Sequence, residues 1–574
     1  MSGLKSKNFL TALILVITSI LFIPFLGKVH LFDWDEINFA ECAREMIVTK
    51  NYSTVQINFQ PFWEKPPLFI WLQVIAMKLF GINEFSARFP NAICGILTSI
   101  ILFRIGSKLI DKRFGLLWTL SFIGSILPFM YFKSGIIDPF FNLFTFLAIY
   151  FTIICSHLQD NKTIKYSLYS GILIGLATLT KGPVALLIFS VCIFIYLIVS
   201  KQIKSFKMKW YLFFIISFLS TCGTWFIYLW QSGNSKLIID FIDYQIRLFN
   251  TKDAGHGGFL GYHFVVLLLG CFPASIFAIR GFKKFKDEAP YVAHFKRWMI
   301  IFFWVVLILF TIVKTKIIHY SSMCYFPISF LSAYTLYKLI QNEWTINKIY
   351  KILFLIIGIT IALCFTILPN LDHLKPFLLE KGLIKDKFLM DTLTLNIPWV
   401  GWEWVPGLIL IVTVIMFYFK INKINFKISV ILFSYFSFFI FFMLSVVVPK
   451  IEAYTQGPQI EFYKNLKNKN CYAETVNFKS YANFFYSDKQ PELNTPELLK
   501  YVKDKIESDI RTNQPVFNFN LYATNFVRNE KIQFPAYFVV KSDHIDVFKI
   551  ECPDSKMLYK KGGYFFLYRP SSKN

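Results

Sequence analysis

Thirteen long apolar stretches divide this chain of 574 residues, and they constrain its fold more than any other feature. A helix that crosses a bilayer needs about 20 mostly apolar residues, because the hydrocarbon core is about 30 Å thick. The stretches are 8–28, 88–108, 114–133, 139–157, 166–180, 182–200, 210–230, 260–280, 298–313, 320–339, 349–369, 404–420 and 428–448. They predict a polytopic α-helical membrane protein with about 13 transmembrane helices, and they exclude an ordinary soluble domain.

The basic residues alternate from one side of these stretches to the other. Loops on one side together carry 24 Lys and Arg residues, whereas the short loops opposite carry only Lys133, Lys181, Lys314 and Lys316. Basic loops stay in the cytoplasm, so the N-terminus is predicted there, and 13 spans leave the C-terminus outside. Retained loop cations account for much of the net charge of +25, and no nucleic-acid partner is predicted.

The chain is predicted to have two parts. Residues 1–449 form a transmembrane domain, which includes two external loops at 29–87 and 231–259. Residues 450–574 are polar and form a small extracytoplasmic α/β domain, with a helix around Glu497–Ser508 and strands at Ala536–Lys541 and Tyr564–Arg569. Cys471 and Cys552 lie in this domain, and the sequence leaves open whether they form a disulfide.

The first external loop begins with three carboxylates, Asp33, Asp35 and Glu36. Apolar residues recur after them at helical spacing, at Ile37, Ala40, Ala43 and Ile47. This spacing predicts an amphipathic helix that lies in the membrane interface with Asp35 and Glu36 in its first turn. A plain alternative is that these acids only complement the dipole of a helix N-terminus.

Several other charged residues fall at the same outer rim. Glu64-Lys65-Pro66-Pro67 forms a rigid corner in the first loop, and Arg88 follows it. Further candidates lie in later loops, at Asp138, Lys181, Arg247, His256 and Lys316. Snorkelling or structural pairing could explain any one of them, but together they suit a phosphorylated lipid with its head group at the interface.

Motifs in the first loop resemble those of a known family. They are Asp35-Glu36…Phe39-Ala40-Glu41…Ala43-Arg44-Glu45-Met46, Glu64-Lys65-Pro66-Pro67-Leu68 and Asn83-Glu84-Phe85-Ser86-Ala87-Arg88-Phe89-Pro90. They resemble the signature of the lipid A aminoarabinose transferases, whose wider group includes the protein O-mannosyltransferases with a GT-C glycosyltransferase fold. Thr180-Lys181-Gly182-Pro183 and His256-Gly257-Gly258 resemble later motifs of the same family.

The resemblance implies an inverting glycosyltransferase that moves a sugar from a polyprenyl (undecaprenyl) phosphate carrier to an acceptor outside the cytoplasm. Asp35 would be the key catalytic acid, with Asp138 and Glu36 as further catalytic candidates. The phosphate of the carrier would be bound by cations, for which the candidates are Lys65, Arg88, Lys181, Arg247 and Lys316. Glu64 and His256 match polar positions that could ligate a divalent metal ion, the one cofactor considered.

The family pattern is not followed everywhere. Asn38 stands where family members commonly have Arg or Lys, and Gly258-Phe259 stands where they commonly have Gly-Pro. The sugar and the acceptor therefore stay open: lipid A, or another cell-envelope glycolipid or glycan. The expected location is the inner (plasma) membrane, with the site and the C-terminal domain in the periplasm. Two alternatives are a transporter or flippase of polyprenyl-linked glycans and a membrane scaffold with a binding tail.

Overall fold

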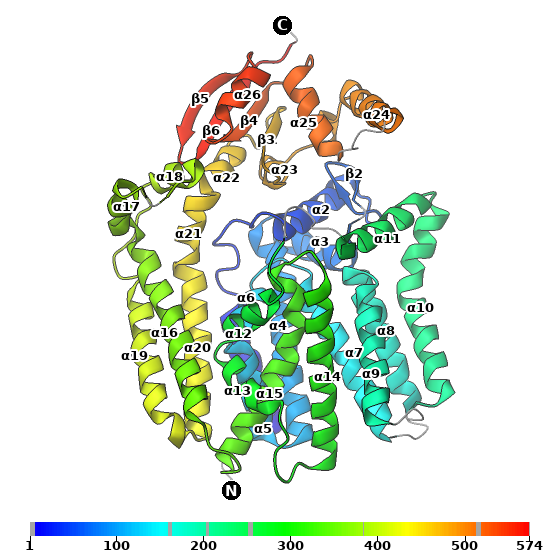
Figure 1. Ribbon diagram of the computed structural model, residues 1–574. Coiled ribbons are helices and arrows are strands. Elements are labelled where there is room, and N and C mark those ends of the chain that lie inside the picture. Colours follow the sequence, from blue (N-terminus) through cyan, green and yellow to red (C-terminus); the bar gives the residue numbers. More distant parts are fainter. Residues whose placement is uncertain are drawn as a thin grey trace.

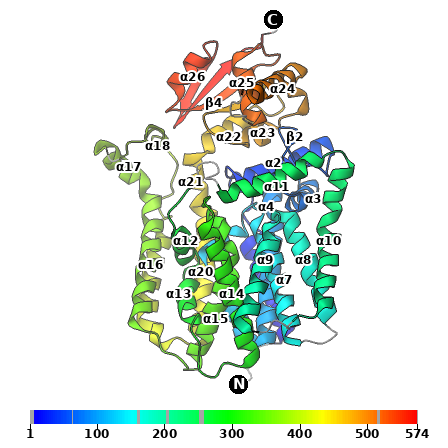
Figure 2. The ribbon, with the colours of Figure 1, turned by 45° about the vertical axis from the view of Figure 1, so that its right-hand side comes forward.

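The computed structural model describes residues 6–62, 64–158, 163–201, 206–250, 257–382, 384–512 and 518–572. A bundle of long helices forms the lower part of the molecule, and a small domain built on a β-sheet covers its upper end (Figure 1). The two ends of the chain lie at opposite ends of the molecule, the N-terminus below and the C-terminus above (Figures 1 and 2).

Each predicted apolar stretch is helical in the structure. Nine of the stretches each correspond to one main helix: α1 (Lys7–Phe22), α4 (Glu84–Leu109), α7 (Asp138–Leu158), α8 (Thr163–Lys181), α9 (Val184–Ser200), α10 (Met208–Gln231), α14 (Pro290–Ile312), α16 (Lys348–Ile367) and α19 (Val405–Lys420). The stretch at 428–448 is α20 (Phe426–Val446), which leads into α21 (Val448–Thr455). The predicted boundary at 449/450 therefore falls inside α21.

The remaining three stretches are broken. Residues 114–133 form α5 (Lys112–Ile123) and α6 (Ile126–Tyr131), and residues 320–339 form the 3-10 helix η3 (Ile318–Cys324) followed by α15 (Tyr325–Ile340). Residues 260–280 form α12 (Tyr262–Gly270) and α13 (Ala274–Gly281), which meet at 115°. Pro273 precedes α13, and a proline has no N–H to continue the hydrogen-bond ladder of a helix.

By length and composition, seven described helices can cross a membrane, or eight if the bent pair counts as one span. Shorter apolar helices such as α1 and α9 are not in that count, so the number 13 stays a prediction. The fold class is nevertheless confirmed: a mostly helical membrane protein with a small C-terminal domain that contains a sheet.

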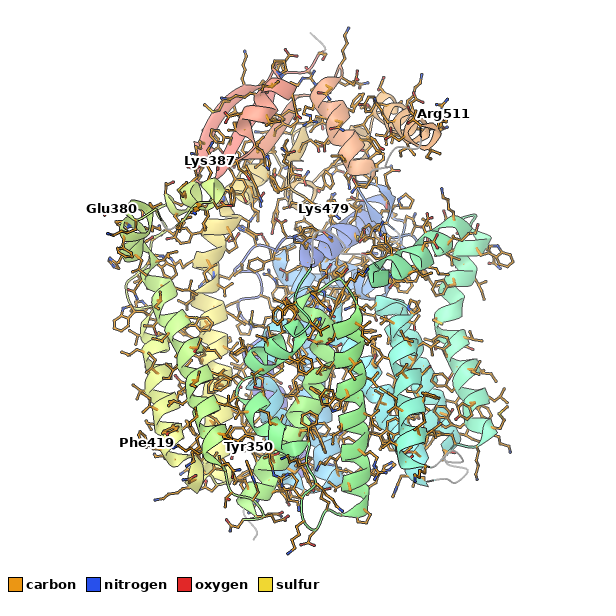
Figure 3. All side chains as sticks on the ribbon, in the orientation of Figure 1. Tyr350, Glu380, Lys387, Phe419, Lys479 and Arg511 are labelled. Atoms are coloured by element: carbon orange, nitrogen blue, oxygen red, sulfur yellow. The ribbon has the colours of Figure 1, made fainter. Side chains whose placement is uncertain are left out.

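The two predicted external loops lie at the upper end, together with the segment 368–393 between α16 and α19, and these parts of the chain contain several short elements. They are α2 (Asp35–Thr49), a hairpin of β1 (Gln56–Ile57) and β2 (Gln60–Pro61), α3 (Leu68–Phe80), α11 (Ser235–Asn250), η4 (Leu368–Asn370), α17 (Leu371–Glu380) and α18 (Lys387–Leu393). In Figure 3, Glu380, Lys387, Lys479 and Arg511 lie at this end, whereas Tyr350 and Phe419 lie at the lower end. Tyr350 and Phe419 adjoin Lys351 and Lys420 of the basic loops.

The prediction of an amphipathic helix after Asp35 is only half right. The helix forms, but every residue from Glu36 to Met46 is buried. It lies between the bundle and the C-terminal domain rather than with one face in water (Figure 2). The apolar residues of α2 form one covered face. The polar residues on its other face are covered by the C-terminal domain, which the local spacing of residues does not predict.

The C-terminal domain (residues 450–572 as described) contains a four-stranded sheet in the order β3-β4-β6-β5. Its strands are β3 (Tyr472–Val476), β4 (Ala536–Lys541), β5 (Lys556–Lys561) and β6 (Tyr564–Arg569), and only β3 and β4 pair in parallel. Its helices are α22 (Gly457–Lys464), α23 (Ala482–Ser487), η6 (Pro491–Leu493), α24 (Pro496–Arg511), α25 (Phe519–Asn529) and α26 (Ile545–Glu551). Cys471 and Cys552 are free, buried thiols.

The predicted strands at β4 and β6 and the predicted helix at α24 are confirmed. Strands β3 and β5 were not predicted. Every residue of β5 is exposed, so it lacks the alternation of buried and exposed positions that marks a strand in a sequence.

Helices α8 and α10 pack closely because small residues line their contact. Gly171 and Gly175 stand four positions apart on α8, opposite Ser217 and Thr221 of α10. A Cβ atom added at Gly171 would lie 2.0 Å from the Ser217 Oγ and 2.4 Å from the Phe214 backbone oxygen. Small residues at such spacing allow helix backbones to approach in a membrane, where apolar burial alone drives no association.

We therefore expect Gly171→Ala to destabilise the folded protein by about 1–3 kcal/mol through overpacking. Thermal unfolding in detergent measures this effect as a lower melting temperature. Gly223→Ala is the matched control on α10, because its added Cβ would meet no described atom within 4 Å beyond its chain neighbours and the nearby backbone of its own helix. Equal melting temperatures for the two variants would contradict the close packing of α8 on α10.

Candidate functional site

Four ionisable residues meet where helices end at the top of the bundle. The Asp35 Oδ2 lies 3.1 Å from the His319 Nε2, and the same nitrogen lies 3.9 Å from the Asp138 Oδ2. The Asp138 Oδ1 accepts a hydrogen bond of 2.6 Å from the Lys181 Nζ. The chain Asp35–His319–Asp138–Lys181 thus joins four separate helices into one ionic cluster.

The position of each charge follows from the helix that bears it. Asp35 and Asp138 are the first residues of α2 and α7, and Lys181 is the last residue of α8. The N-terminus of a helix carries partial positive charge and its C-terminus partial negative charge, so each charged group is stabilised by its own helix. Helix termini therefore place two acids and a lysine side by side at the upper end of the bundle.

Asp35 is the most accessible acid of this cluster. Its side chain is 28% exposed, whereas Asp138 is 1% exposed. Burial opposes ionisation of Asp35, but the hydrogen bond from His319 and the cations Lys65 and Lys181 outweigh it and hold the pKa of Asp35 well below its usual range. Asp35 is therefore a carboxylate at neutral pH and can accept a hydrogen bond or a proton.

The two carboxylate oxygens of Asp138 have different surroundings. Its Oδ2 is buried and has no hydrogen-bond partner among the described residues. A buried carboxylate oxygen without a partner is costly, so such atoms mark strain or a place for a water or a ligand. This oxygen points to the same side as His319, which lies 3.9 Å away.

His319 is the residue of this cluster that sequence reasoning did not single out. It stands in the segment Val313–Tyr320, which drew attention only for its lysines. A lone histidine carries little signal, because its role depends on what the fold places against it. Here it connects the two acids that the sequence did predict.

The three neighbouring acids of the first loop contact three different partners. Asp35 contacts His319, whereas Asp33 accepts a hydrogen bond from the Ser480 hydroxyl of the C-terminal domain. Glu36 is buried, and its two oxygens accept from the Arg88 guanidinium, each at 2.8 Å, and from the backbone N–H groups of Phe32 and Gly135.

Arg88 uses all five of its N–H donors. Besides the two bonds to Glu36, it donates to the backbone oxygens of Leu26, Val29 and His30 at 2.7, 2.6 and 2.9 Å. Glu36 and Arg88 had been predicted as catalytic and carrier-binding candidates. In the structure the polar atoms of both side chains are engaged, and the pair braces the first loop. The roles predicted for these two residues stay predictions.

Two of the lysines that break the charge alternation cap helices. The Lys316 Nζ donates to the backbone oxygens of Phe310, Thr311 and Val313 at the end of α14. The Lys133 Nζ does the same for Leu21, Phe22 and Pro24 at the end of α1. The last carbonyls of a helix lack partners within it, and a lysine can satisfy them. Lys316 is thus engaged with a helix end rather than free to bind a phosphate.

Lys65 and Arg247 lie together at the ring of Tyr244, and the charge of Lys65 acts on Asp35. The Lys65 Nζ is 5.9 Å and the Arg247 guanidinium carbon 5.2 Å from the centre of the Tyr244 ring on α11. The Tyr244 hydroxyl donates to the Glu64 Oε2 at 3.3 Å. Two cations on one aromatic ring, near a carboxylate at Asp35, form the part of the site best suited to an anionic group.

Glu64 and His256 are the predicted metal ligands. His256 lies outside the described residues, and Glu64 contacts Tyr244. Within the described part of the chain, no group of three or more His, Cys, Asp or Glu side chains could hold a metal ion.

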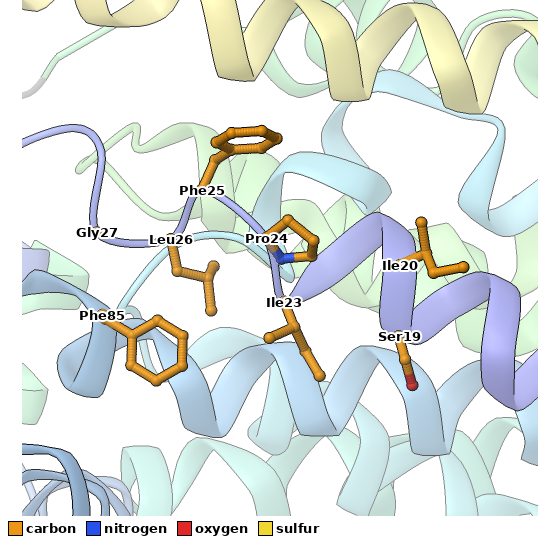
Figure 4. Close-up of a pocket in the computed structure, with 8 residues that line it drawn as sticks. All are labelled: Ser19, Ile20, Ile23, Pro24, Phe25, Leu26, Gly27 and Phe85. Atoms are coloured by element: carbon orange, nitrogen blue, oxygen red, sulfur yellow. The ribbon is translucent and has the colours of Figure 1, made fainter.

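An apolar groove of about 480 Å³ lies away from the charged cluster, where α1 ends (Figure 4). It is lined by Ser19, Ile20, Ile23, Pro24, Phe25, Leu26, Gly27 and Phe85. None of the candidate site residues lines it, so it is separate from the Asp35–His319–Asp138–Lys181 cluster.

Comparisons with known proteins agree with this architecture. The family described as dolichyl-phosphate-mannose-protein mannosyltransferase matches residues 64–228. An undecaprenyl phosphate-alpha-4-amino-4-deoxy-L-arabinose arabinosyl transferase from Wigglesworthia glossinidia brevipalpis is 28% identical over 340 residues, which are 57% of this chain and 59% of that relative. The corresponding protein of Shewanella sediminis is 24% identical over 343 residues, 59% of this chain and 62% of its own length. The chain thus spans about three-fifths of the length of these relatives.

The crystal structure of ArnT from Cupriavidus metallidurans bound to undecaprenyl phosphate has the same fold, with a TM-score of 0.73, 15% identity and 99% of both chains covered. The fold is that of polytopic membrane proteins of the GT-C type. Within that class, the matches confirm the resemblance to the lipid A aminoarabinose transferases that the first-loop motifs indicated.

If Arg88 is a brace, its removal should affect folding more than catalysis. Arg88→Ala leaves the buried Glu36 charge without its partner, which costs about 3–5 kcal/mol. We expect a low yield of monodisperse protein and a lower melting temperature. Arg104→Ala, which removes an exposed arginine from the same helix, is the control and should change neither. A well-folded Arg88→Ala protein that only binds carrier poorly would contradict this assignment.

Proposed function

We propose that this protein is an inverting glycosyltransferase of the membrane, which moves a sugar from a polyprenyl phosphate carrier to an acceptor on the side of the C-terminal domain. The observation that carries the proposal is the ionised, partly exposed Asp35 joined through His319 to Asp138 at the surface of a GT-C-type bundle. The relatives named as arabinosyl transferases support the reaction class.

The reaction breaks one bond and forms another at the anomeric carbon. The bond to the carrier phosphate breaks, and the polyprenyl phosphate leaves with the electron pair. An acceptor oxygen attacks from the opposite face, which inverts the configuration. If the acceptor is a hydroxyl, its proton passes to the Asp35 carboxylate as general base. If the acceptor is itself a phosphate, no proton is removed, and Asp35 only orients the acceptor.

The departing phosphate needs nearby cations, because charge grows on its oxygens as the bond breaks. Lys65 and Arg247 fit this role, since they share the Tyr244 ring near Asp35. Lys181 holds Asp138 and contributes positive charge to the same cluster. Lys316 caps α14, and Arg88 braces the first loop, so we assign neither to the phosphate.

We also propose candidates for the sugar and the acceptor, on the basis of the named relatives. An aminoarabinose donor and lipid A, or another glycolipid or glycan of the cell envelope, are the candidates. We further propose that the basic lower loops face the cytoplasm, because cytoplasmic loops retain Lys and Arg. The site and the C-terminal domain then lie outside the inner membrane, in the periplasm of a Gram-negative cell.

A transporter of polyprenyl-linked glycans is less well supported. Transporters commonly use matched broken helices in two related halves, with the binding site near the middle of the membrane. Among the described helices, only α12 and α13 are apolar and long enough to form one span together while being bent by more than 40° at the break. The ionic cluster lies instead at helix ends near the covered upper surface.

Mass spectrometry of lipid A and of polyprenyl-linked glycans tests the proposed function. A strain that lacks the gene is compared with the same strain carrying a wild-type copy. A sugar that is absent from one envelope molecule and restored by the copy supports a transferase and identifies its acceptor. Unchanged products, with altered movement of a carrier-linked glycan across the membrane, would support the transporter instead.

Asp35→Asn should separate the two versions of the mechanism. With a hydroxyl acceptor, loss of a general base lowers kcat by about 10²–10⁴-fold. With a phosphate acceptor the loss should be much smaller. Transfer by purified protein from a defined polyprenyl phosphate sugar, with products counted by mass spectrometry, measures the ratio. Asp504→Asn, at an exposed position of α24, is the matched control. Full activity of Asp35→Asn with every acceptor would remove Asp35 from the mechanism.

A further inference from the structure

The turn that leads into Asp35 is held from above by the C-terminal domain. The Tyr486 hydroxyl accepts a hydrogen bond of 2.8 Å from the Leu31 N–H, and the Gln456 amide donates one of 3.0 Å to the Leu31 oxygen. The Ser480 hydroxyl donates to Asp33. Each of these bonds joins the first loop to a residue more than 400 positions away.

The residue between Asp33 and Asp35 is strained. Trp34 has φ 72° and ψ −125°, a conformation that favours glycine and that a bulky side chain adopts at a cost. Such a conformation persists only where its surroundings fix it, and it is found mainly at functional sites. The Lys479 Nζ lies 5.5 Å from the centre of the Trp34 ring, and Figure 3 shows Lys479 between the C-terminal domain and α2.

The rest of α2 is held by the same domain. Arg44 donates to both oxygens of Glu41 at 2.7 Å and to the Asp488 Oδ1 at 3.0 Å. Glu45 accepts the N–H groups of Asn58 and Phe59 at the tip of the β1–β2 hairpin, at 2.6 and 2.7 Å. Through Glu45, α2 therefore also fixes the position of the hairpin.

The hairpin tip in turn docks into the C-terminal domain. Asn58 accepts from Lys489 at 2.6 Å through its side chain and from Asn494 at 2.8 Å through its backbone oxygen, and it donates to Asn520 at 2.8 Å. Asn58 and Lys489 are 1% and 5% exposed. Buried polar contacts of this kind are costly to break, so the domain is fixed on α2 at both ends of the helix.

We infer that the C-terminal domain positions the catalytic carboxylate: Asp33, through Ser480, is a positioning residue that holds the Trp34 turn so that Asp35 faces His319. This inference rests on the proposed function. It assigns to the domain a role in kcat rather than in capture of the acceptor. A displacement of about 1 Å in a catalytic group can cost about 10²-fold in rate.

Kinetics of Asp33 variants test the inference. Asp33→Ala removes the acceptor of the Ser480 bond and leaves the Ser480 bond to the Ala482 N–H intact. We expect kcat to fall by about 10–10²-fold with KM for donor and acceptor within about threefold of wild type. Asp33→Asn, which keeps an oxygen to accept from Ser480, should restore most of kcat. Glu551→Ala, which breaks an exposed contact with Arg528 elsewhere in the domain, should match wild type.

Two kinetic outcomes would overturn the inference. One is that both kcat and KM are unchanged in Asp33→Ala, so that the Ser480 bond has no effect on the reaction. The other is an unchanged kcat with a raised KM for the acceptor, which would make the domain an acceptor-binding surface.

Hydrogen–deuterium exchange gives a readout that does not depend on activity. The amides of Leu31 and Phe32, which donate to Tyr486 and Glu36, should exchange at least tenfold faster in Asp33→Ala than in wild type and Glu551→Ala. Equal exchange in all three proteins would overturn the inference even if kcat falls. Absence of transfer by wild-type protein with every donor would defeat the proposed function alone, and exchange would still show whether the domain holds the turn.

Discussion

The buried ion pair of Arg88 and Glu36 is the interaction on which the candidate site depends. Arg88 lies on α4 of the bundle, and its five donors reach Glu36 and the backbone of Leu26, Val29 and His30. One side chain thus fixes both the exit of the chain from α1 and the first turn of α2. An unpaired ion at this depth would cost several kcal/mol, so the loop has little freedom to leave this place, and Asp35 precedes Glu36 directly.

Helix termini explain most of the other charges at this end of the bundle. Asp35 and Asp138 begin helices, Lys181 ends one, and Lys133 and Lys316 satisfy the last carbonyls of α1 and α14. A membrane bundle cannot leave such carbonyls unpaired away from water. Of the lysines on the side where few are expected, Lys133 and Lys316 cap helices, whereas Lys181 pairs with Asp138. The cations that we propose for the carrier phosphate are a different pair, Lys65 and Arg247 at the Tyr244 ring.

The C-terminal domain and the bundle hold α2 between them from opposite sides. Ser480, Gln456 and Tyr486 fix the turn before Asp35 from above, and Arg88 and His319 fix it from below. The strained Trp34 lies at the junction of these two sets of contacts. These contacts together hold the Asp35 carboxylate in one place at the upper end of the bundle.

Local pattern determined a large part of this protein. The length of the apolar stretches predicted each helical stretch. Asp35, Asp138 and Lys181 were predicted at the outer rim because charged side chains are unfavourable in the membrane interior. Tertiary structure alone decided which of these groups meet. His319 contacts both Asp35 and Asp138, and all N–H donors of Arg88 bind Glu36 and three backbone oxygens. These contacts exist because packing brings distant segments of the chain together. Helix propensity, hydropathy and capping depend on residues that are close in the sequence, so the sequence reveals them. The partner of a buried charge depends on how the helices pack. The spacing of residues along one segment contains no information about that packing.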